Sequence, residues 1–308
     1  MSQARTMDGK VVIVTGAGGG VGKAIALLAA AEGAKVVVND LGVSLNGEKQ
    51  ALSPAEQVVQ AIQTAGGQAI ANADSVADWD SAQRMVEQAV DTFGRIDAVV
   101  NSAGILRDAI FHKLEPADFE SVIRVHLFGA YNTSRAAASH FRAQGGGALV
   151  HMTSTSGLIG GLGQANYAAA KMGIVGLSRS ISMDMARFGV RSNCIAPHAF
   201  SRMIESVPGL SPEEQERYLE KRRQTTRPEQ IAPLAVLLCS DQAKDVSGQI
   251  FGARGNEVYL YNQPRPIRTL QRGEGWTPST LAEQMIPAWR TSFTPAERTK
   301  DVFGWEAI

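Results

Sequence analysis

A tyrosine and a lysine one helical turn apart are the residues of this sequence best suited to acid–base chemistry. Tyr167 and Lys171 stand at positions i and i+4, so on a helix they lie on one face. A lysine ammonium beside a phenol lowers the pKa of the phenol and makes it usable as a general base near neutrality. Ser154, thirteen residues before the tyrosine and just past an apolar run, could bind the same substrate oxygen. The three residues predict a site that removes a proton from a hydroxyl group.

The spacing of the tyrosine and the basic residue is a weak signal by itself. Three other tyrosines have an arginine four residues later, namely Tyr131, Tyr218 and Tyr261. Only Tyr167 follows an apolar run and a serine-rich loop, and this context makes the set of three specific.

A glycine-rich run, TGAGGGVG at 15–22, could bind a dinucleotide. It lies between a β-branched run and a helix-like segment, where glycines allow a tight turn and let a pyrophosphate approach the helix N-terminus. Asp40 ends the next strand-like run, 24 residues after Gly16. A carboxylate there accepts both hydroxyls of the adenosine ribose and repels a 2′-phosphate, so the pattern favours NAD over NADP. The alternative for Asp40 is a turn residue at a strand end.

Other chemistries have weaker support. Residues 176–180 (GLSRS) lack the final glycine of a hydrolase nucleophile elbow and fall in a helix-like segment. The five histidines show no metal-ligand spacing, so we expect no metal site. The charged run 213–223 is mixed in sign and reads as a solvated helix face.

The elements that must position these residues alternate between strands and helices. The predicted strands are 10–15, 35–40, 68–71, 97–101, 148–153 and 190–196, and the predicted helices are 21–31, 55–65, 78–93, 116–142 and 166–187. Such alternation predicts parallel strands joined by right-handed crossovers, with helices on both faces. We therefore expect an α/β fold with a doubly wound, Rossmann-type parallel sheet.

Charge and composition exclude several classes of protein. The 308 residues carry 30 Lys+Arg and 30 Asp+Glu, a balance that argues against a nucleic-acid footprint or a polybasic membrane patch. The longest apolar stretches, such as 24–31 and 234–239, are far shorter than a membrane span. Two cysteines make no disulfide framework, and the first strand-like run begins too early for a secretory signal. These features predict a cytoplasmic protein with no nucleic-acid or membrane partner.

The chain after Gly255 differs in composition from the rest. It holds five of the 12 prolines and three of the four tryptophans: Trp276, Trp289 and Trp305. So many prolines make a regular sheet improbable there, while the aromatic residues argue against disorder. We expect one domain at 7–254 and an extension at 255–308 that packs on its own domain or on a second subunit.

The motifs resemble those of the short-chain dehydrogenase/reductase family over residues 7–254. Residues 15–22 match TGxxxGxG, residues 101–104 (NSAG) match NNAG with one change, and residues 195–197 (IAP) match the segment before the nicotinamide loop. Ser154, Tyr167 and Lys171 match the catalytic set. The resemblance implies NAD contacts at Gly16, Gly19, Gly20, Val21, Gly22, Asp40, Asp74, Ser75, Asn101, Ala103, Gly104, Tyr167, Lys171 and Pro197. It also implies a homodimer or homotetramer built on helices 116–142 and 166–187.

Within this family the sequence is similar to the dehydrogenase domain of peroxisomal multifunctional enzyme type 2. The similarity lies in residues 39–42 (NDLG), 104–108 (GILRD), 125–127 (VHL), 163–167 (GQANY) and the tail. It implies oxidation of a 3-hydroxyacyl-CoA, including those of steroid side chains, or of a hydroxysteroid. One departure from the wider family is His126, which stands where most members have an asparagine of a proton relay. His126 could support that relay or be a core histidine.

The leading hypothesis is therefore an NAD-dependent dehydrogenase that acts on a secondary hydroxyl of a small molecule. Residues 198–224 would supply an apolar wall with Met203, Ile204, Val207 and Leu210, and a cationic rim with Lys221, Arg222 and Arg223. A catalytically silent nucleotide-binding scaffold on the same fold is the alternative, but it has no need of all three catalytic residues.

Overall fold

A parallel sheet forms the centre of the molecule. The computed structural model describes residues 5–42, 52–199 and 211–307. Within these ranges an eight-stranded sheet has the order β3-β2-β1-β4-β5-β6-β7-β8. Its strands are β1 (Val11–Thr15), β2 (Lys35–Asn39), β3 (Gln68–Asn72), β4 (Ala98–Asn101), β5 (Gly147–Met152), β6 (Val190–His198), β7 (Ile250–Arg254) and β8 (Glu257–Leu260). The first seven run parallel and β8 pairs antiparallel with β7.

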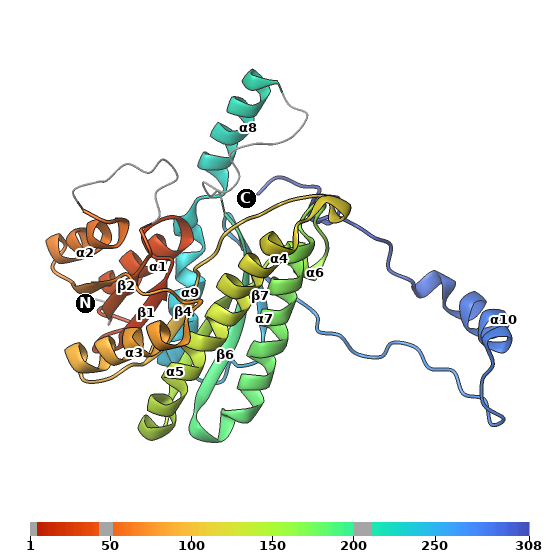
Figure 1. Ribbon diagram of the computed structural model, residues 1–308, viewed down its shortest axis with the longest axis horizontal. Coiled ribbons are helices and arrows are strands. Elements are labelled where there is room, and N and C mark those ends of the chain that lie inside the picture. Colours follow the sequence, from red (N-terminus) through yellow and green to blue (C-terminus); the bar gives the residue numbers. More distant parts are fainter. Residues whose placement is uncertain (1–4, 43–51, 200–210, 308) are drawn as a thin grey trace.

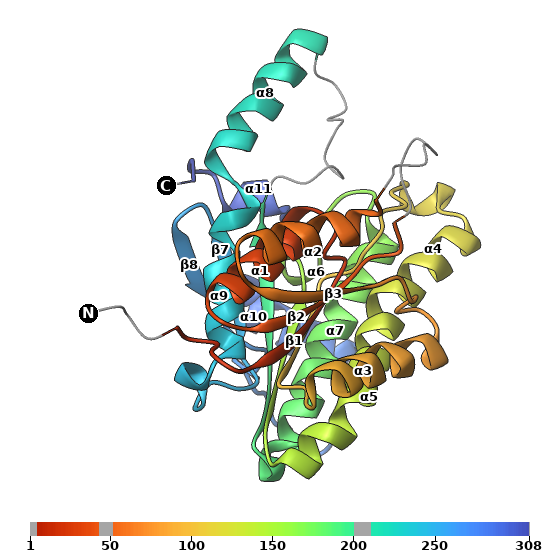
Figure 2. The ribbon, with the colours of Figure 1, turned by 90° about the vertical axis from the view of Figure 1, so that its left-hand side faces the viewer.

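Helices cover both faces of the sheet, as the alternation of elements predicts (Figures 1 and 2). On one face, apolar residues of α1 (Gly20–Ala31), α2 (Pro54–Thr64) and α9 (Ala232–Cys239) form one core. On the other face, α3 (Trp79–Phe93), α5 (Gly129–Gln144) and α7 (Ala165–Asp184) form a second. The strands are buried on both sides, which explains why β1 and β2 are nearly continuous runs of valine and isoleucine. The expected doubly wound α/β fold is confirmed.

The predicted helix 116–142 is continuous but not uniform. Helix α4 (Pro116–Ile123) passes through one π-helical turn, Arg124–Phe128, into α5. Such turns add one residue to the helical ladder and redirect side chains, often at functional sites. The turn carries His126 on a buried face.

The expectation of no sheet in the tail is wrong for residues 257–260. This stretch precedes the first proline of the tail, Pro264, and its alternating Glu-Val-Tyr-Leu pattern suits an edge strand. The pairing sets Tyr259 opposite Gly252, where a Cβ would lie 3.1 Å from the Tyr259 ring. The missing side chain at 252 leaves room for that ring.

Beyond β8 the tail leaves the domain and then returns to it. Residues 262–296, which we call the arm, project outward with α10 (Pro278–Trp289) at the tip (Figure 1). The last segment, with α11 (Thr299–Val302), lies against the domain. There Phe303 contacts the rings of His198 and Tyr259, and the Trp305 indole N–H donates to Glu257 at 2.8 Å.

No helix in the described residues has the length and apolar character needed to cross a membrane.

Two truncations should separate the role of β8 from that of all the residues after it. A chain ending at Tyr261 keeps β8, so we expect it to stay folded with a free energy of unfolding within about 2 kcal/mol of the full chain. A chain ending at Gly255 loses β8 and opens the edge of β7, so it should aggregate or unfold at lower urea concentration. Urea titration with sedimentation measures both. Equal stability and solubility of the two truncated chains would contradict a structural role for β8.

Candidate active site

The candidate residues meet at the edge where the parallel strands end. Thr15 ends β1, Asn101 ends β4 and Met152 ends β5, and β1, β4 and β5 are neighbours in the sheet. The turns that follow these strands carry the glycine run, residues 102–109 and Ser154. Ligands of open α/β sheets bind at such an edge, where the strand order reverses.

Ser154, Tyr167 and Lys171 are brought together by α7 and the turn after β5. Ser154 is the N-cap of the short helix α6 (Thr155–Leu158), and its Oγ accepts a hydrogen bond from the Ser156 N–H at 3.1 Å. Ser154 also acts on Tyr167, since hydrogen bonding by this serine lowers the pKa of the phenol. Lys171 Nζ lies 5.4 Å from the centroid of the Tyr167 ring. The spacing that predicted one shared helix face therefore places all three groups at one point.

Lys171 is buried and has one close acceptor. Its Nζ donates to the carbonyl oxygen of Met152 at 2.7 Å, while its own backbone carbonyl accepts from the Thr153 hydroxyl at 2.7 Å. Burial lowers the pKa of Lys171 to about 7. The amine is thus close to equal populations of its two protonation states at neutral pH.

The pKa of Tyr167 differs from the expectation. Burial raises it, the hydrogen bond with Ser154 lowers it, and the charge of Asp108 raises it further. The neighbouring lysine charge is visible in the sequence, whereas the removal of water around the phenol, which disfavours the phenolate, depends on the fold.

The glycine run forms a turn that is too close to its neighbours for side chains. Gly16 has φ +63°, and a Cβ there would lie 2.7 Å from the Cα of Ala103. A Cβ on Gly22 would lie 2.4 Å from the carbonyl oxygen of Gly16. Gly19 is the N-cap of α1, and neither a capping side chain nor an acidic residue occupies the first turn. The first N–H groups of α1 therefore remain available to an anion, as a pyrophosphate requires.

Asp40 directly follows β2 and is held by two backbone amides. Its Oδ2 accepts from the Gly18 N–H at 2.9 Å and its Oδ1 from the Gly42 N–H at 2.9 Å. A Cβ on Gly18 would lie 2.7 Å from Oδ2, so glycine is needed for this approach. The carboxylate is fixed beside the glycine turn, where the sequence placed it.

Asn101, Ala103 and Gly104 occupy the turn after β4. The Asn101 side chain accepts from Thr133 Oγ1 at 2.5 Å and donates to Ser134 Oγ at 3.2 Å. That side chain is committed to the interior, so a cofactor contact at this position would come from the backbone. Thr15 positions the turn, because its Oγ1 accepts from the N–H groups of Ser102 and Ala103 at 3.1 Å each.

The other predicted cofactor contacts lie at the same edge. Asp74 and Ser75 follow β3, where Asp74 Oδ1 accepts from Arg84 at 2.6 Å and the Asp74 backbone carbonyl accepts from Asn39 at 2.8 Å. Gly20 and Val21 begin α1, and Pro197 lies near the end of β6.

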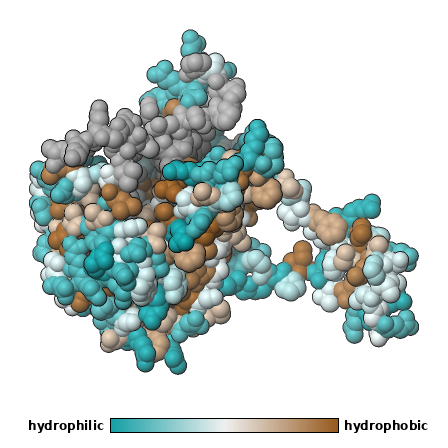
Figure 3. Space-filling view, viewed as in Figure 1, coloured by the Kyte–Doolittle hydropathy of each residue, from teal (hydrophilic) through white to brown (hydrophobic). Residues whose placement is uncertain are grey.

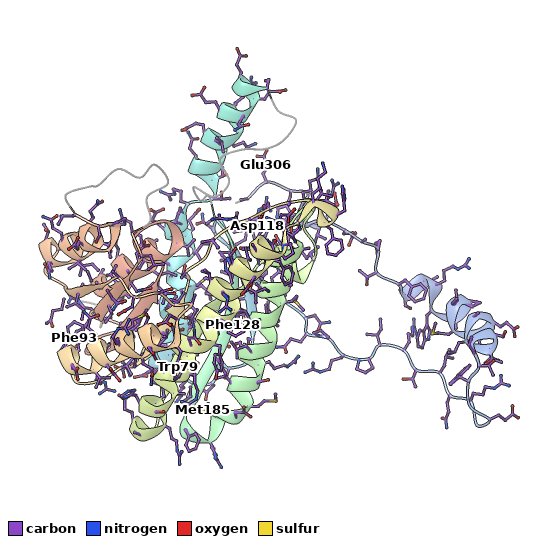
Figure 4. All side chains as sticks on the ribbon, viewed as in Figure 1. Trp79, Phe93, Asp118, Phe128, Met185 and Glu306 are labelled. Atoms are coloured by element: carbon purple, nitrogen blue, oxygen red, sulfur yellow. The ribbon has the colours of Figure 1, made fainter. Side chains whose placement is uncertain are left out.

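Part of the expected substrate wall is not described. Met203, Ile204, Val207 and Leu210 lie outside the described residues, as do the side chains of Arg222 and Arg223. Lys221 forms an ion pair with Glu306 of the tail, which is labelled in Figure 4 beside α8 (Pro212–Thr225).

Two residues that were not among the predicted site residues, although they lie in the GQANY motif, organise the mouth of the site. Asn166, fully buried, donates to the Arg107 carbonyl at 2.8 Å. Gln164 accepts from Ser156 Oγ and donates to Asp108 Oδ2, both at 2.8 Å. Their position immediately before Tyr167 was the available signal. In the described part of the chain, no cluster of three or more His, Cys, Asp or Glu side chains is arranged to hold a metal ion.

Comparisons with known proteins identify the family and the fold. The family model for short chain dehydrogenases matches residues 10–206. Mouse peroxisomal multifunctional enzyme type 2 is 43% identical over 248 residues, which are 80% of this chain and 32% of that enzyme. Hydroxyacyl-CoA dehydrogenase ChsB1 of Mycobacterium tuberculosis is 36% identical over 284 residues, covering 89% of this chain and 87% of that protein. A crystal structure of a short chain dehydrogenase from Mycobacterium avium, 39% identical, has a TM-score of 0.83 and covers 95% of this chain and 98% of its own.

The chain spans about a third of the mouse enzyme and most of the two mycobacterial proteins.

Burial of Lys171 should leave a signature in the pH dependence of stability. Because its pKa is near 7 when folded and 10.5 when unfolded, the unfolded state binds more protons between these values. Stability should therefore rise with pH from about 7 to about 10 in the wild type, relative to Lys171→Met, which cannot titrate. Urea unfolding of both proteins across this range measures the difference. Parallel curves would contradict a buried, easily deprotonated amine.

Proposed function

The chain belongs to the short-chain dehydrogenase family, and from that premise we propose that it oxidises a secondary hydroxyl with NAD as the hydride acceptor. The observation that carries the proposal is the meeting of Ser154, Tyr167 and Lys171 beside the glycine turn. A scaffold protein would gain nothing from a buried amine next to a buried phenol, which is costly to fold.

The residues at the edge of the sheet fit a dinucleotide. The turn at Gly16 and Gly22 leaves no room for side chains, the first amides of α1 are uncapped, and Asp40 is held in place for a ribose diol. These groups would hold NAD, whose nicotinamide ring supplies the hydride acceptor.

In the proposed reaction Tyr167 removes the hydroxyl proton. Ser154 holds the substrate oxygen by a hydrogen bond, and Lys171 stabilises the phenolate by its charge. Burial works against the phenolate, so Ser154 and Lys171 must offset that cost. In the structure the phenol holds its proton more tightly than the amine does, because burial raises the pKa of Tyr167 and lowers that of Lys171 to about 7.

The substrate that we propose is a 3-hydroxyacyl-CoA, and a steroid side-chain thioester is one form of it. Support comes from the names of the relatives, which are a multifunctional peroxisomal enzyme and a hydroxyacyl-CoA dehydrogenase. Ile110, Phe111 and Leu162 are exposed apolar side chains on the two segments that the hydrogen bond from the Ala109 N–H to the Gly163 carbonyl joins, and they suit the hydrocarbon part of such a substrate. A 17-hydroxysteroid is the alternative within the same chemistry.

The decisive experiment compares a 3-hydroxyacyl-CoA, the same acid without CoA and a 17-hydroxysteroid at saturating NAD. Binding energy from the remote CoA can be used to align the reacting carbon, so kcat/KM should be highest for the thioester. Tyr167→Phe should keep NAD affinity and lose about 10²–10⁴-fold in turnover. An equal or higher kcat/KM for the free steroid would replace the acyl-CoA assignment. If the wild type forms no NADH with any of the three compounds, the proposal as a whole is contradicted.

Cofactor choice should depend on Asp40. Asp40→Ala removes the acceptor for the ribose diol and the repulsion of a 2′-phosphate, so NAD should bind more weakly while NADP does not. Asp40→Asn is the matched control, because it removes the charge and keeps an acceptor oxygen. Fluorescence titration with NADH and NADPH measures both affinities. A wild type that binds NADPH as tightly as NADH would refute the charge argument.

We also propose that the protein assembles as a homodimer or homotetramer. Figure 3 shows hydrophobic side chains on the face presented by α5 and α7 and again on the arm. The exposed apolar or aromatic side chains of this part of the domain are Phe128, labelled in Figure 4, Tyr131, Met172 and Met183; those of the arm include Ile267, Leu270, Ile286 and Phe293. A second subunit would cover both surfaces. Sedimentation of the chain that ends at Tyr261 shows whether the subunit count depends on the arm and the last segment together.

A further inference from the structure

The segment Gly104–Ala109, which we call the β4 loop, runs from the turn after β4 to the mouth of the site. It is tied to the residues around Tyr167 at three successive positions. The Arg107 carbonyl accepts from Asn166, the Asp108 carboxylate accepts from Gln164, and the Ala109 N–H donates to the Gly163 carbonyl at 2.9 Å. All three ties come from the segment just before Tyr167, so they leave the first residues of the loop unsupported.

His126 supports the beginning of the β4 loop from the opposite side. Its Nε2 lies 2.8 Å from the carbonyl oxygen and 3.1 Å from the backbone nitrogen of Ile105. The ring packs against Gly104, where a Cβ would lie 2.3 Å from Cε1, so any side chain at 104 would displace it. The same ring stands edge-on to Tyr167, with centroids 5.2 Å apart and planes at 89°. One imidazole therefore contacts both the beginning of the β4 loop and the candidate base, Tyr167.

The imidazole is neutral under ordinary conditions. Burial, and then the nearby charge of Lys171, lower the pKa of His126 to about 3. A neutral ring has one N–H, and the short contact with the Ile105 carbonyl requires it on Nε2. Nδ1 is then an acceptor, and it has no hydrogen-bond partner among the described residues. The other tautomer would leave a buried donor unpaired, which proteins tolerate less readily.

We propose that His126 is a positioning residue, which acts through Nε2 to hold the β4 loop and the Tyr167 ring in register, and that it takes no part in proton transfer. The proposal rests on the proposed function, because it assigns the purpose of that register to hydride and proton transfer. A displacement of about 1 Å at such a contact can cost roughly 10²-fold in rate without weakening cofactor binding.

Three variants of the full-length protein separate the two ring nitrogens. A glutamine amide reaches the position of Nε2, an asparagine amide reaches only that of Nδ1, and phenylalanine keeps a ring without either. We expect His126→Gln to keep kcat within about 3-fold, and His126→Asn and His126→Phe to lose about 10–100-fold. The dissociation constant for NADH should change by less than about 3-fold in all three. In a Tyr167→Phe background the same substitutions should lower kcat little further, because the residual rate no longer depends on the phenol.

Amide hydrogen exchange of residues 105–109 gives a readout that needs no substrate. Exchange should speed up in His126→Asn and His126→Phe and stay at the wild-type rate in His126→Gln. The exchange rates can be measured even if the wild type oxidises none of the test substrates. A failure of the proposed role of His126 can therefore be distinguished from a failure of the proposed function. Activity retained by His126→Asn but lost by His126→Gln would overturn the proposal and assign the role to Nδ1. Equal losses of kcat, NADH affinity and melting temperature in all three variants would leave His126 with a structural role only, and would overturn it as well.

Discussion

The hydrogen bond between Lys171 and the Met152 carbonyl fixes the site more than any other contact. A buried amine without a partner would be strongly destabilising, so the end of β5 and the second turn of α7 must stay at this distance. Thr153 adds a second bond between the same two elements by donating to the Lys171 carbonyl. Tyr167 lies one turn earlier on α7 and Ser154 two residues beyond Met152. Their positions follow from the pairing of strand and helix that satisfies the amine.

Beneath this contact a buried polar network keeps the sheet and the two central helices in one arrangement. Asn101 donates to His151 Nδ1 at 3.2 Å, and His151 Nε2 lies 3.2 Å from Ser192 Oγ, which is 2.8 Å from Ser178 Oγ on α7. Burial lowers the pKa of His151 to about 4, so the ring is neutral, and the bond from Asn101 to Nδ1 puts its N–H on Nε2. Networks of this kind are stable only when every member is paired, which makes β4, β5 and α7 interdependent.

Sequence patterns predicted those elements whose formation depends on neighbouring residues. The strands and helices of residues 10–196 follow from β-branched runs and helical periodicity, and their ends differ from the prediction by a few residues at most. β8 was missed because the prolines of the tail were counted together, although Glu257–Leu260 precedes them all. The side chain of Asn101 was placed by resemblance, and only the packing shows that it points into the interior network. The contact of His126 with Ile105 joins residues 21 apart and depends on a π-helical turn that no sequence period indicates.

The pKa shifts of Tyr167 and Lys171 have opposite signs but one cause. Burial disfavours the phenolate and the ammonium alike, so each group taken alone prefers to be neutral. Moving one proton from the phenol to the amine, however, leaves the net charge of the pair unchanged and creates two opposite charges on neighbouring side chains, with Lys171 Nζ 5.4 Å from the centroid of the Tyr167 ring. Their attraction is strong where water is excluded, so the ionised pair can be reached even though neither charge is favourable alone. The hydroxyl of Ser154 favours the phenolate and the carboxylate of Asp108 opposes it. A cationic nicotinamide ring beside the phenol would also favour the phenolate, because an opposite charge nearby stabilises the charged form. In the proposed oxidation of an alcohol, the phenolate is needed at the start, when the nicotinamide ring would be cationic, and the neutral phenol at the end, when it would not. Because burial keeps Tyr167 and Lys171 from ionising alone, in this reaction the proton would follow the charge of the cofactor.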